Sequence, residues 1–399
     1  MPANGQVNDT GVDFVIIAND WAAGKDNPTS KHRIAHELAR RGSKVLWLEG
    51  SGMRKPSLGS GSDRIRIIGK LKAILRGPVR DASLQDRKVW VLSLPLIPLP
   101  MKAGIRRLNG WIARTCAAFW AWRLGFRSPV LINYVPVLAE AMPGWKGFKL
   151  YHCVDRWDAF GAYNSALMAQ MDQRCCEYAD AVAATSQDLL ERCRRHNLNT
   201  ALVLHGVDLA HFARALEPWE RPADLPPGPV IGFFGLLSEW LDYPLILATA
   251  KAYPEAHVVL IGRADVNVTS LQGVENLLVL GPRPFAALPR YIAHFQVGLI
   301  PFLLNELTMA VNPIKLREML SAGCAVVSTA LPEVERLEAS ANGGVRVGYT
   351  SQEFVAAVGE YLQKPSTSEW RRSIHDTMAG ETWECKVSQL LELLPKSKA

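Results

Sequence analysis

The sequence predicts an α/β protein made of two doubly wound, Rossmann-like domains, each built on a parallel sheet. Short buried strands alternate with amphipathic helices in both halves of the 399-residue chain, which is typical of repeated βαβ units. A proline-rich stretch, "EPWERPADLPPGP", separates the two series. We therefore predict an N-terminal domain over 1–216, a linker over 217–229, a C-terminal domain over 230–375 and a final helix over 376–399.

The first half opens with "VDFVIIAND", which predicts a buried strand over 12–18. The helix "KHRIAHELARRG" and the strand "KVLWLEG" follow, and this strand–helix–strand order implies parallel pairing. Further strands are expected at 130–134, 149–154, 181–185 and 201–204.

The second half repeats the pattern, beginning with a strand, a glycine turn and a helix in "VIGFFGLLSEWLDYPLILATAKAYP". Strands in "AHVVLIGRAD", "ENLLVLGPRP" and "VGLIPF" follow, the last two separated by a short helix, "FAALPRYIAHF". The stretch "NPIKLREMLSAGCAVVST" then predicts a helix with Asn312 as N-cap and Gly323 at its end, followed by an inner strand. Lys315 and Glu318 lie three residues apart on this helix. They form either a surface ion pair or part of a phosphate site at the helix N-terminus.

Composition excludes several classes of protein. The chain shows no secretory signal pattern and no apolar run near the roughly 18–20 residues that span a bilayer. Its seven cysteines include no C-x-x-C pair, so we expect reduced thiols in a cytoplasmic protein.

The net charge of +7 is unevenly distributed. Residues 54–127 hold 16 Lys or Arg and three Asp or Glu, with Ile, Leu, Trp and Phe interleaved in "IRRLNGWIARTCAAFWAWRLGFR". This pattern fits a helix on an anionic membrane surface, or a core-packed helix with a basic solvated edge. Nucleic-acid binding is disfavoured because no nucleic-acid motif accompanies the charge.

Polar residues and glycines recur at predicted carboxyl ends of strands, where open parallel sheets bind ligands. They are Asp20, Glu49, Asp155, Gly235, Arg263, Arg283, Asn305 and Glu306. We expect the two sheets to present these ends to one cleft. The chain has no G-x-G-x-x-G after a strand, no P-loop, no G-x-S-x-G and no D-x-D. A diphosphate would therefore be held without a metal, by cationic side chains and helix N–H groups.

In order and spacing, "IGFFGLLSEWLD", "VVLIGRAD", "NLLVLGPRPFAALPRYIAHFQVGLIPF" and "NELTMAVNPIKLREMLSAGCAVVST" resemble the donor-binding half of GT-B glycosyltransferases. These enzymes use nucleotide sugars, and the likeness is to the family 1/4 type that assembles polysaccharides. "YHCVDRWDAF", "ADAVAATSQDLLERC" and "LHGVDLAHF" resemble the later part of the acceptor half. The resemblance is good over 151–329 and loose over 14–48.

The resemblance implies donor-binding roles for Gly235, Arg263, Arg283, Asn305, Glu306, Thr308, Asn312, Lys315 and Glu318. Glu318 matches the acidic residue that binds both ribose hydroxyls of the nucleotide. Lys315 and Arg263 would neutralise the diphosphate, Gly235 would allow close backbone approach, and Arg283 would frame the base.

The loop at 305–308 would contact the sugar. Many retaining members carry a second glutamate eight residues before the first, and that position is Ala310 here. Glu306 is a candidate substitute, and inversion or retention at the anomeric carbon stays open.

On the acceptor side we predict Asp155 as the general base, with Asp20 as the second candidate. The structural alternative for Asp155 is an N-cap or a partner for Arg156. His152 is interpreted as a strand histidine satisfied by its neighbours.

The sequence thus predicts a metal-independent glycosyltransferase, of hexosyl type, without a cofactor beyond its nucleotide-sugar co-substrate. The expected acceptor is a lipid-linked glycan or an exopolysaccharide precursor, met at the inner face of the membrane by a peripherally bound protein. The alternatives are a nucleotide-sugar epimerase or phosphorylase, or a non-catalytic nucleotide-sugar-binding protein on the same fold.

Overall fold

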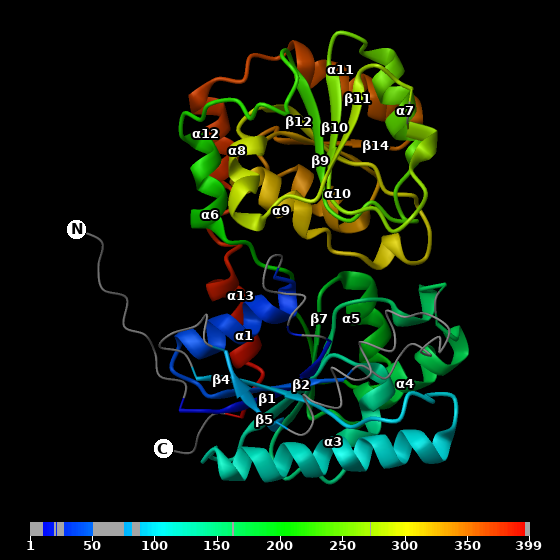
Figure 1. Cartoon of the computed structure of the whole chain (residues 1–399), viewed down its shortest axis with the longest axis vertical. Helices are drawn as coiled ribbons and strands as arrows, with labels where there is room; N and C mark the ends of the chain where they lie inside the picture. The colour runs from blue at the N-terminus through cyan, green and yellow to red at the C-terminus, as the bar shows by residue number, and fades with distance from the viewer. Residues whose placement is uncertain are drawn as a thin grey trace, which may run out of the picture. The chain divides into compact units, whose positions relative to one another are not determined.

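A computed structural model describes most of the chain (Figure 1). The described residues are 11–19, 21, 28–50, 76–81, 88–161, 163–271 and 273–395. They divide into two compact units, the first made of residues 1–204 with 387–399 and the second of residues 205–386.

The first unit contains a sheet that is parallel apart from one edge strand. Its order among the described residues is β3-β4-β2-β1-β5-β6-β7-β8, and only β3 runs antiparallel to its neighbour. The strands are β1 (Phe14–Ala18), β2 (Val45–Glu49), β3 (Val79–Arg80), β4 (Val89–Ser93), β5 (Val130–Asn133), β6 (Lys149–Cys153), β7 (Ala181–Ala184) and β8 (Thr200–Leu202). The helices described are α1 (Ser30–Arg40), α3 (Ala103–Arg123), α4 (Ser165–Tyr178) and α5 (Gln187–Arg194), with a 3-10 segment η2 (Pro136–Ala141).

The second unit contains a fully parallel sheet of order β11-β10-β9-β12-β13-β14. Its strands are β9 (Val230–Phe234), β10 (His257–Ile261), β11 (Leu277–Gly281), β12 (Phe295–Ile300), β13 (Val326–Thr329) and β14 (Val345–Gly348). Its helices are α6 (Leu209–Ala213), α7 (Tyr243–Ala252), α8 (Leu288–Ile292), α9 (Ile314–Ser321), α10 (Pro332–Glu338), α11 (Ser351–Gln363), α12 (Ser368–Asp376) and the start of α13 (Trp383–Leu391).

Local sequence explains why these elements form. The central strands β1, β5, β7, β9 and β13 are buried at every position, as expected for strands covered on both faces. Within the described parts of the chain, six helices begin at a residue whose side chain accepts a backbone N–H, which satisfies one of the free donors of the first turn. These residues are Asn164, Ser186, Asp208, Asp242, Thr350 and Thr367.

The predicted fold class, two doubly wound α/β halves, is confirmed. Strand β4, which lies in the apolar stretch "VWVLSLPLIPLP", was not predicted, and neither were the elements between β13 and α13. Among the described residues, no helix is both long and apolar enough to cross a bilayer.

The two units of the structure divide the chain differently from the predicted domains in two places. The proline-rich stretch 217–229 is part of the second unit, because Leu225 is buried in its core and Asp224 pairs with Arg283. The final helix also does not stand alone, since α13 starts in the second unit and passes into the first at Val387.

Candidate functional site

Two glycines follow the strands at the centre of the second sheet. Gly235 comes directly after β9, and its N–H donates to the carbonyl of Ile261 at 2.9 Å. Gly262 follows β10, and a Cβ atom there would lie 1.7 Å from the carbonyl oxygen of Gly235. Only glycine allows this close crossing, which leaves the backbone at the carboxyl end of β9 bare of side chains.

Lys315 and Glu318 lie beside this bare backbone, on the first turns of α9. The Lys315 ammonium is 2.6 Å from a Glu318 carboxylate oxygen and 4.7 Å from the centre of the Phe234 ring. A Cβ atom on Gly235 would be 3.7 Å from Cε of Lys315. The structure therefore brings Gly235, Lys315 and Glu318 together. The ion pair that the sequence left open is present, with Glu318 buried and Lys315 half-buried.

The start of α9 differs from the prediction. Pro313, and not Asn312, is the N-cap residue, and it offers no side-chain acceptor to the first-turn N–H groups. Those donors suit an anion at this helix end. Asn312 is buried instead, and its side-chain oxygen accepts from Nη1 of Arg317 at 2.6 Å.

Arg317 ties α9 to the segment that leads into α13. Its Nε is 2.8 Å from a carboxylate oxygen of Glu381, which also pairs with Lys386 at 2.9 Å. Burial favours the neutral form of Glu381, but Arg317 and Lys386 outweigh it and lower the pKa of this carboxyl. Asn312 and Arg317 thus hold α9 in place beneath the Lys315–Glu318 pair.

The loop before α9 is ordered by its own side chains. The Asn305 side-chain oxygen accepts from the backbone N–H groups of Leu307 and Thr308, at 3.0 and 3.1 Å. The buried Thr308 hydroxyl donates to the carbonyl of Leu303 and accepts from the N–H of Asn305. Glu306 is exposed between them. Asn305 and Thr308 therefore shape the loop, and Glu306 is its outward-facing carboxylate.

The two predicted arginines have different surroundings. Arg263 is exposed just after Gly262, close in the chain to the bare backbone. Arg283 is held by a 2.5 Å contact with Asp224 and donates from Nε to the Tyr291 hydroxyl at 2.9 Å. The hydrogen bond to Asp224 also raises the pKa of Arg283. Arg263 is the freer of the two to meet a ligand.

In the first unit, Asp155 follows the carboxyl end of β6 and is coupled to a buried lysine that the sequence did not single out. Lys31, on the first turn of α1, places its ammonium 5.3 Å from the Trp157 ring and 5.8 Å from the Tyr134 ring. Burial lowers the pKa of Lys31 and raises that of Asp155, while each charge partly offsets the shift of the other. An aspartate with a raised pKa accepts protons more readily than an ordinary one.

The remaining predictions in this region have mixed outcomes. Nδ1 of His152 lies 3.0 Å from the Tyr134 hydroxyl, as expected for a strand histidine bonded to its neighbours. Arg156 pairs with Asp158 at 3.6 Å. Asp20, the second catalytic candidate, lies outside the described residues. No sequence signal marks Lys31, because the groups near it come from the segments that follow β5 and β6, far away in the chain.

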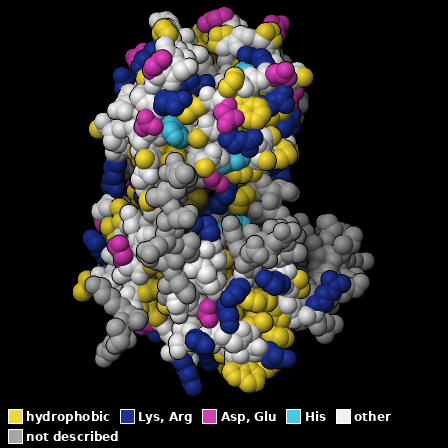
Figure 2. Space-filling view, turned by 90° about the vertical axis from the view of Figure 1, so that its left-hand side faces the viewer, with side chains coloured by type: hydrophobic (Ala, Val, Ile, Leu, Met, Phe, Trp, Pro, Cys, Tyr) yellow, Lys and Arg dark blue, Asp and Glu magenta, His cyan; other side chains and the backbone are white. Residues whose placement is uncertain are grey.

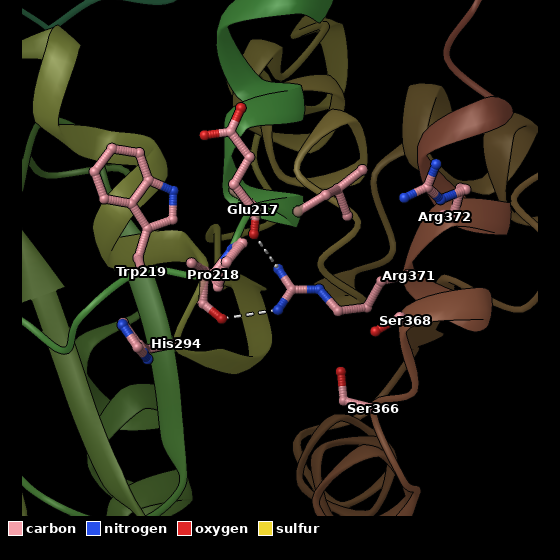
Figure 3. A pocket seen from close by; sticks show the side chains of 11 residues that line it. Glu217, Pro218, Trp219, His294, Ser366, Ser368, Arg371 and Arg372 are labelled. Carbon is pink, nitrogen blue, oxygen red and sulfur yellow. Dashed lines mark hydrogen bonds between the residues drawn. The ribbon is translucent and has the colours of Figure 1, made fainter.

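A pocket of about 390 Å³ lies elsewhere in the second unit, between residues 215–219, His294 and α12 (Figure 3). Arg371 donates to the carbonyls of Ala293 at 2.8 Å and Ala322 at 3.0 Å, so its guanidinium joins separate segments of chain. None of the predicted site residues lines this pocket.

The second unit is similar to a known protein family. Residues 228–364 match the model of a family described as glycosyl transferases group 1. The chain is also 24% identical over 262 residues to the "Putative teichuronic acid biosynthesis glycosyltransferase TuaH" of Bacillus subtilis (strain 168). That match covers 61% of this chain and 66% of the relative, which is just under two thirds of the relative's length.

Solved structures share the fold over nearly the whole chain. Sucrose-phosphate synthase from Thermosynechococcus elongatus matches with a TM-score of 0.68 at 14% identity, covering 96% of this chain and 98% of that one. Anabaena HepE in complex with UDP and glucose has a TM-score of 0.63 at 14% identity, covering 96% and 100%. An Escherichia coli trehalose-6-phosphate protein bound with UDP-2-fluoro glucose has a TM-score of 0.64 at 11% identity, covering 96% and 100%. The chain therefore has the GT-B fold, and the resemblance seen in the sequence is confirmed.

Proposed function

We propose that this protein transfers a glycosyl group from a nucleoside diphosphate sugar to an acceptor hydroxyl, because residues 228–364 match the model of the glycosyl transferases group 1 family. The observation that carries the proposal is the Lys315–Glu318 pair. It lies at the N-terminus of α9, beside the glycine that follows β9.

Each donor group has a matching partner in this arrangement. The buried Glu318 carboxylate accepts hydrogen bonds from both ribose hydroxyls, and its burial keeps it in one position. Lys315 and the exposed Arg263 neutralise the diphosphate, together with the N–H groups of the first turn of α9. These fixed positive groups do the work that a divalent cation does in other sites, so we propose a reaction without metal or cofactor.

The loop before α9 contacts the sugar in this proposal, with Glu306 as the carboxylate that reaches its hydroxyls. Arg283 has a smaller share in binding than the sequence implied, because Asp224 and Tyr291 occupy its donors. We propose that it stabilises the position of α8, and that it meets the base through its exposed edge only.

Uridine nucleotides are the first donors to test, because HepE and the Escherichia coli protein were solved with UDP, UDP-glucose or a UDP-glucose analogue. The acceptor we propose is a lipid-linked glycan or an exopolysaccharide precursor. Support for this acceptor comes from the teichuronic acid biosynthesis glycosyltransferase among the relatives. We also propose a hexosyl group as the transferred unit, because HepE was solved with glucose and with UDP-glucose.

In the proposed reaction Asp155 takes the proton from the acceptor hydroxyl while that oxygen attacks the anomeric carbon. The bond from the anomeric carbon to the diphosphate oxygen breaks, and the nucleoside diphosphate leaves with its electron pair. Lys315, Arg263 and the helix N–H groups stabilise the negative charge that develops on this leaving group.

The donor site is tested by thermal shift and calorimetry with UDP, GDP, ADP and UDP-hexoses. We expect one nucleotide to stabilise the protein selectively. Lys315→Ala and Glu318→Gln should weaken its binding by about 10- to 100-fold, since each loses a hydrogen bond to a charged group.

Arg336→Ala is the matched control for these variants. Arg336 and Glu333 form an ion pair with the same i,i+3 spacing on α10, at 2.8 Å. This variant should bind the nucleotide as the wild type does. Unchanged affinity in Lys315→Ala, or no stabilisation by any nucleotide, would contradict the proposed site.

A further inference from the structure

Helix α3 presents its large hydrophobic side chains outward. Trp122 is 72% exposed, Trp111 54%, Phe119 52% and Leu108 42%. These four residues, here called the aromatic face, follow each other at helical spacing and form one stripe along the helix. Single exposed hydrophobic residues are ordinary, but a stripe with two tryptophans and a phenylalanine marks an interaction surface.

The opposite side of α3, which packs on the protein, carries small residues along most of its length, with Arg106 and Asn109 buried near its start. Gly110, Ala113, Ala117 and Ala121 are buried there. A Cβ atom on Gly110 would lie 2.4 Å from the backbone of Glu140, so the helix rests directly on η2. Small side chains therefore make much of the contact with the protein, whereas the four large hydrophobic residues of the aromatic face are exposed. The aromatic face therefore contributes little to the stability of the fold.

The charge around the aromatic face is entirely positive. The segment 99–127 contains six Lys or Arg and no Asp or Glu. Arg107 and Arg123 are exposed on the helix. Arg106 and Arg114 instead donate to the backbone carbonyls of Pro100 and Pro143. Figure 2 shows hydrophobic and basic side chains side by side at the lower end of the view, at the level where Figure 1 places α3.

We propose that the aromatic face of α3 docks on the surface of an anionic lipid bilayer. With 21 residues the helix is about 31 Å long, and it would lie parallel to the surface. Trp and Phe side chains then insert at the level of the headgroups, and the flanking arginines contact lipid phosphates. A bilayer fits better than an acidic protein groove, because the stripe is straight, follows the whole helix and carries cations at both ends.

This inference deepens the proposed function, since a lipid-linked acceptor is presented at such a surface. The membrane proposal depends on the proposed function only for the reason why the protein would bind a membrane, and not for the binding itself. Vesicle binding is measured without donor or acceptor, and nucleotide binding is measured without vesicles, so failure of one proposal is distinguishable from failure of the other.

The test is flotation of the whole protein with two kinds of vesicle, phosphatidylcholine alone and phosphatidylcholine mixed with phosphatidylglycerol. We expect binding to the anionic vesicles that falls as salt is raised. The double variant Trp111→Ala/Trp122→Ala should lower the partition coefficient by about tenfold or more, because two interfacial anchors are lost. Arg107→Gln/Arg123→Gln should lower binding to anionic vesicles by a similar factor and leave the weak binding to neutral vesicles unchanged.

Tyr349→Ala and Leu198→Ala are the matched controls, since both side chains are highly exposed but lie outside α3. Both should float as the wild type does. Circular dichroism and UDP binding of every variant check that the fold is kept. No flotation with either vesicle, or equal flotation of the wild type and the tryptophan double variant, overturns the proposal. So does a concentration-dependent dimer in sedimentation velocity that the same double variant abolishes, because the face would then bind a second copy.

Discussion

Asp155, the proposed general base, lies in surroundings that suit a proton acceptor. Burial raises the pKa of Asp155, and the buried positive charge of Lys31 limits this rise. A lone buried carboxyl would be protonated too readily to act as a base near neutral pH, and a fully exposed one would be a weak base. The lysine thus sets the range over which the carboxylate can accept a proton.

Asp155→Asn should lower kcat by about 10²- to 10⁴-fold, because the amide cannot take the acceptor proton. The KM for the donor should change little, since no donor contact is removed. The measurement is release of nucleoside diphosphate with a saturating acceptor.

Lys31→Met tests the coupling of the two charges. Lys31 lowers the pKa of Asp155, so its removal should raise that pKa further. The acid limb of the kcat/KM profile should then move to higher pH. An acid limb that stays in place while activity falls would mean that Lys31 acts only through packing.

Helix α9 shows how one short element combines support and binding. Its inner side carries Leu316, Met319 and Leu320, all fully buried in the core of the second unit. Arg317 lies fully buried between Asn312 and Glu381. The pair that faces the glycine turn is therefore carried on a helix held by both apolar and ionic contacts, which limits its movement when a ligand binds.

Arg317→Met should reduce the free energy of unfolding by about 3 kcal/mol at neutral pH, because it leaves the buried side of Glu381 without its guanidinium. The pKa of Glu381 in the folded state is below its ordinary value of 4.5. Its contribution to stability is therefore present above about pH 4.5 and is lost as the pH falls through the lowered pKa. The difference in the free energy of unfolding between wild type and variant should therefore be smaller at pH 4 than at pH 7. Urea unfolding at the two pH values measures it.

The control for this comparison is Arg346→Met, whose guanidinium is half-exposed and lies 3.5 Å from Glu360. Arg346→Met should change the free energy of unfolding by no more than about 0.5 kcal/mol at both pH values. An equal loss in the two variants would show that Arg317 is no more than a surface charge.

For the whole chain, the division into two units assigns the proposed donor site to one of them. Every described donor candidate belongs to residues 205–386, and the Lys31–Asp155 pair belongs to the other unit. A ligand that binds only the second unit should stabilise that unit first.

Hydrogen exchange with and without UDP measures this distribution. We expect slower exchange in peptides that contain Gly235, Gly262 and residues 312–318, because the ligand suppresses opening where it binds. Peptides of α3 should exchange at the same rate in both conditions. Protection confined to the first unit would contradict the proposed donor site.

Much of the fold was predictable from residues close together in the chain. Strands and helices follow from local hydrophobic periodicity and capping residues, so β9 to β13 and α9 were found from the sequence. The Lys315–Glu318 pair was accessible for the same reason, since i,i+3 spacing places both side chains on one flank of a helix.

Contacts between distant segments were not accessible in this way. Lys31 meets Asp155, Asp224 meets Arg283 and Arg317 meets Glu381 only after the chain has folded. The boundary between the units was not accessible either. Its proline-rich composition predicts a linker, and only the folded structure shows that Leu225 is buried in the core of the second unit.

The aromatic face of α3 is the clearest case. Its sequence predicted a helix with both apolar and basic residues, and hydrophobic burial would place the tryptophans inside. At Gly110 the helix lies so close to η2 that no side chain fits, and Ala113, Ala117 and Ala121 share that buried side, which leaves the aromatic face exposed. Periodicity thus accounts for which residues share a side of this helix, whereas packing distance selects which side meets the protein.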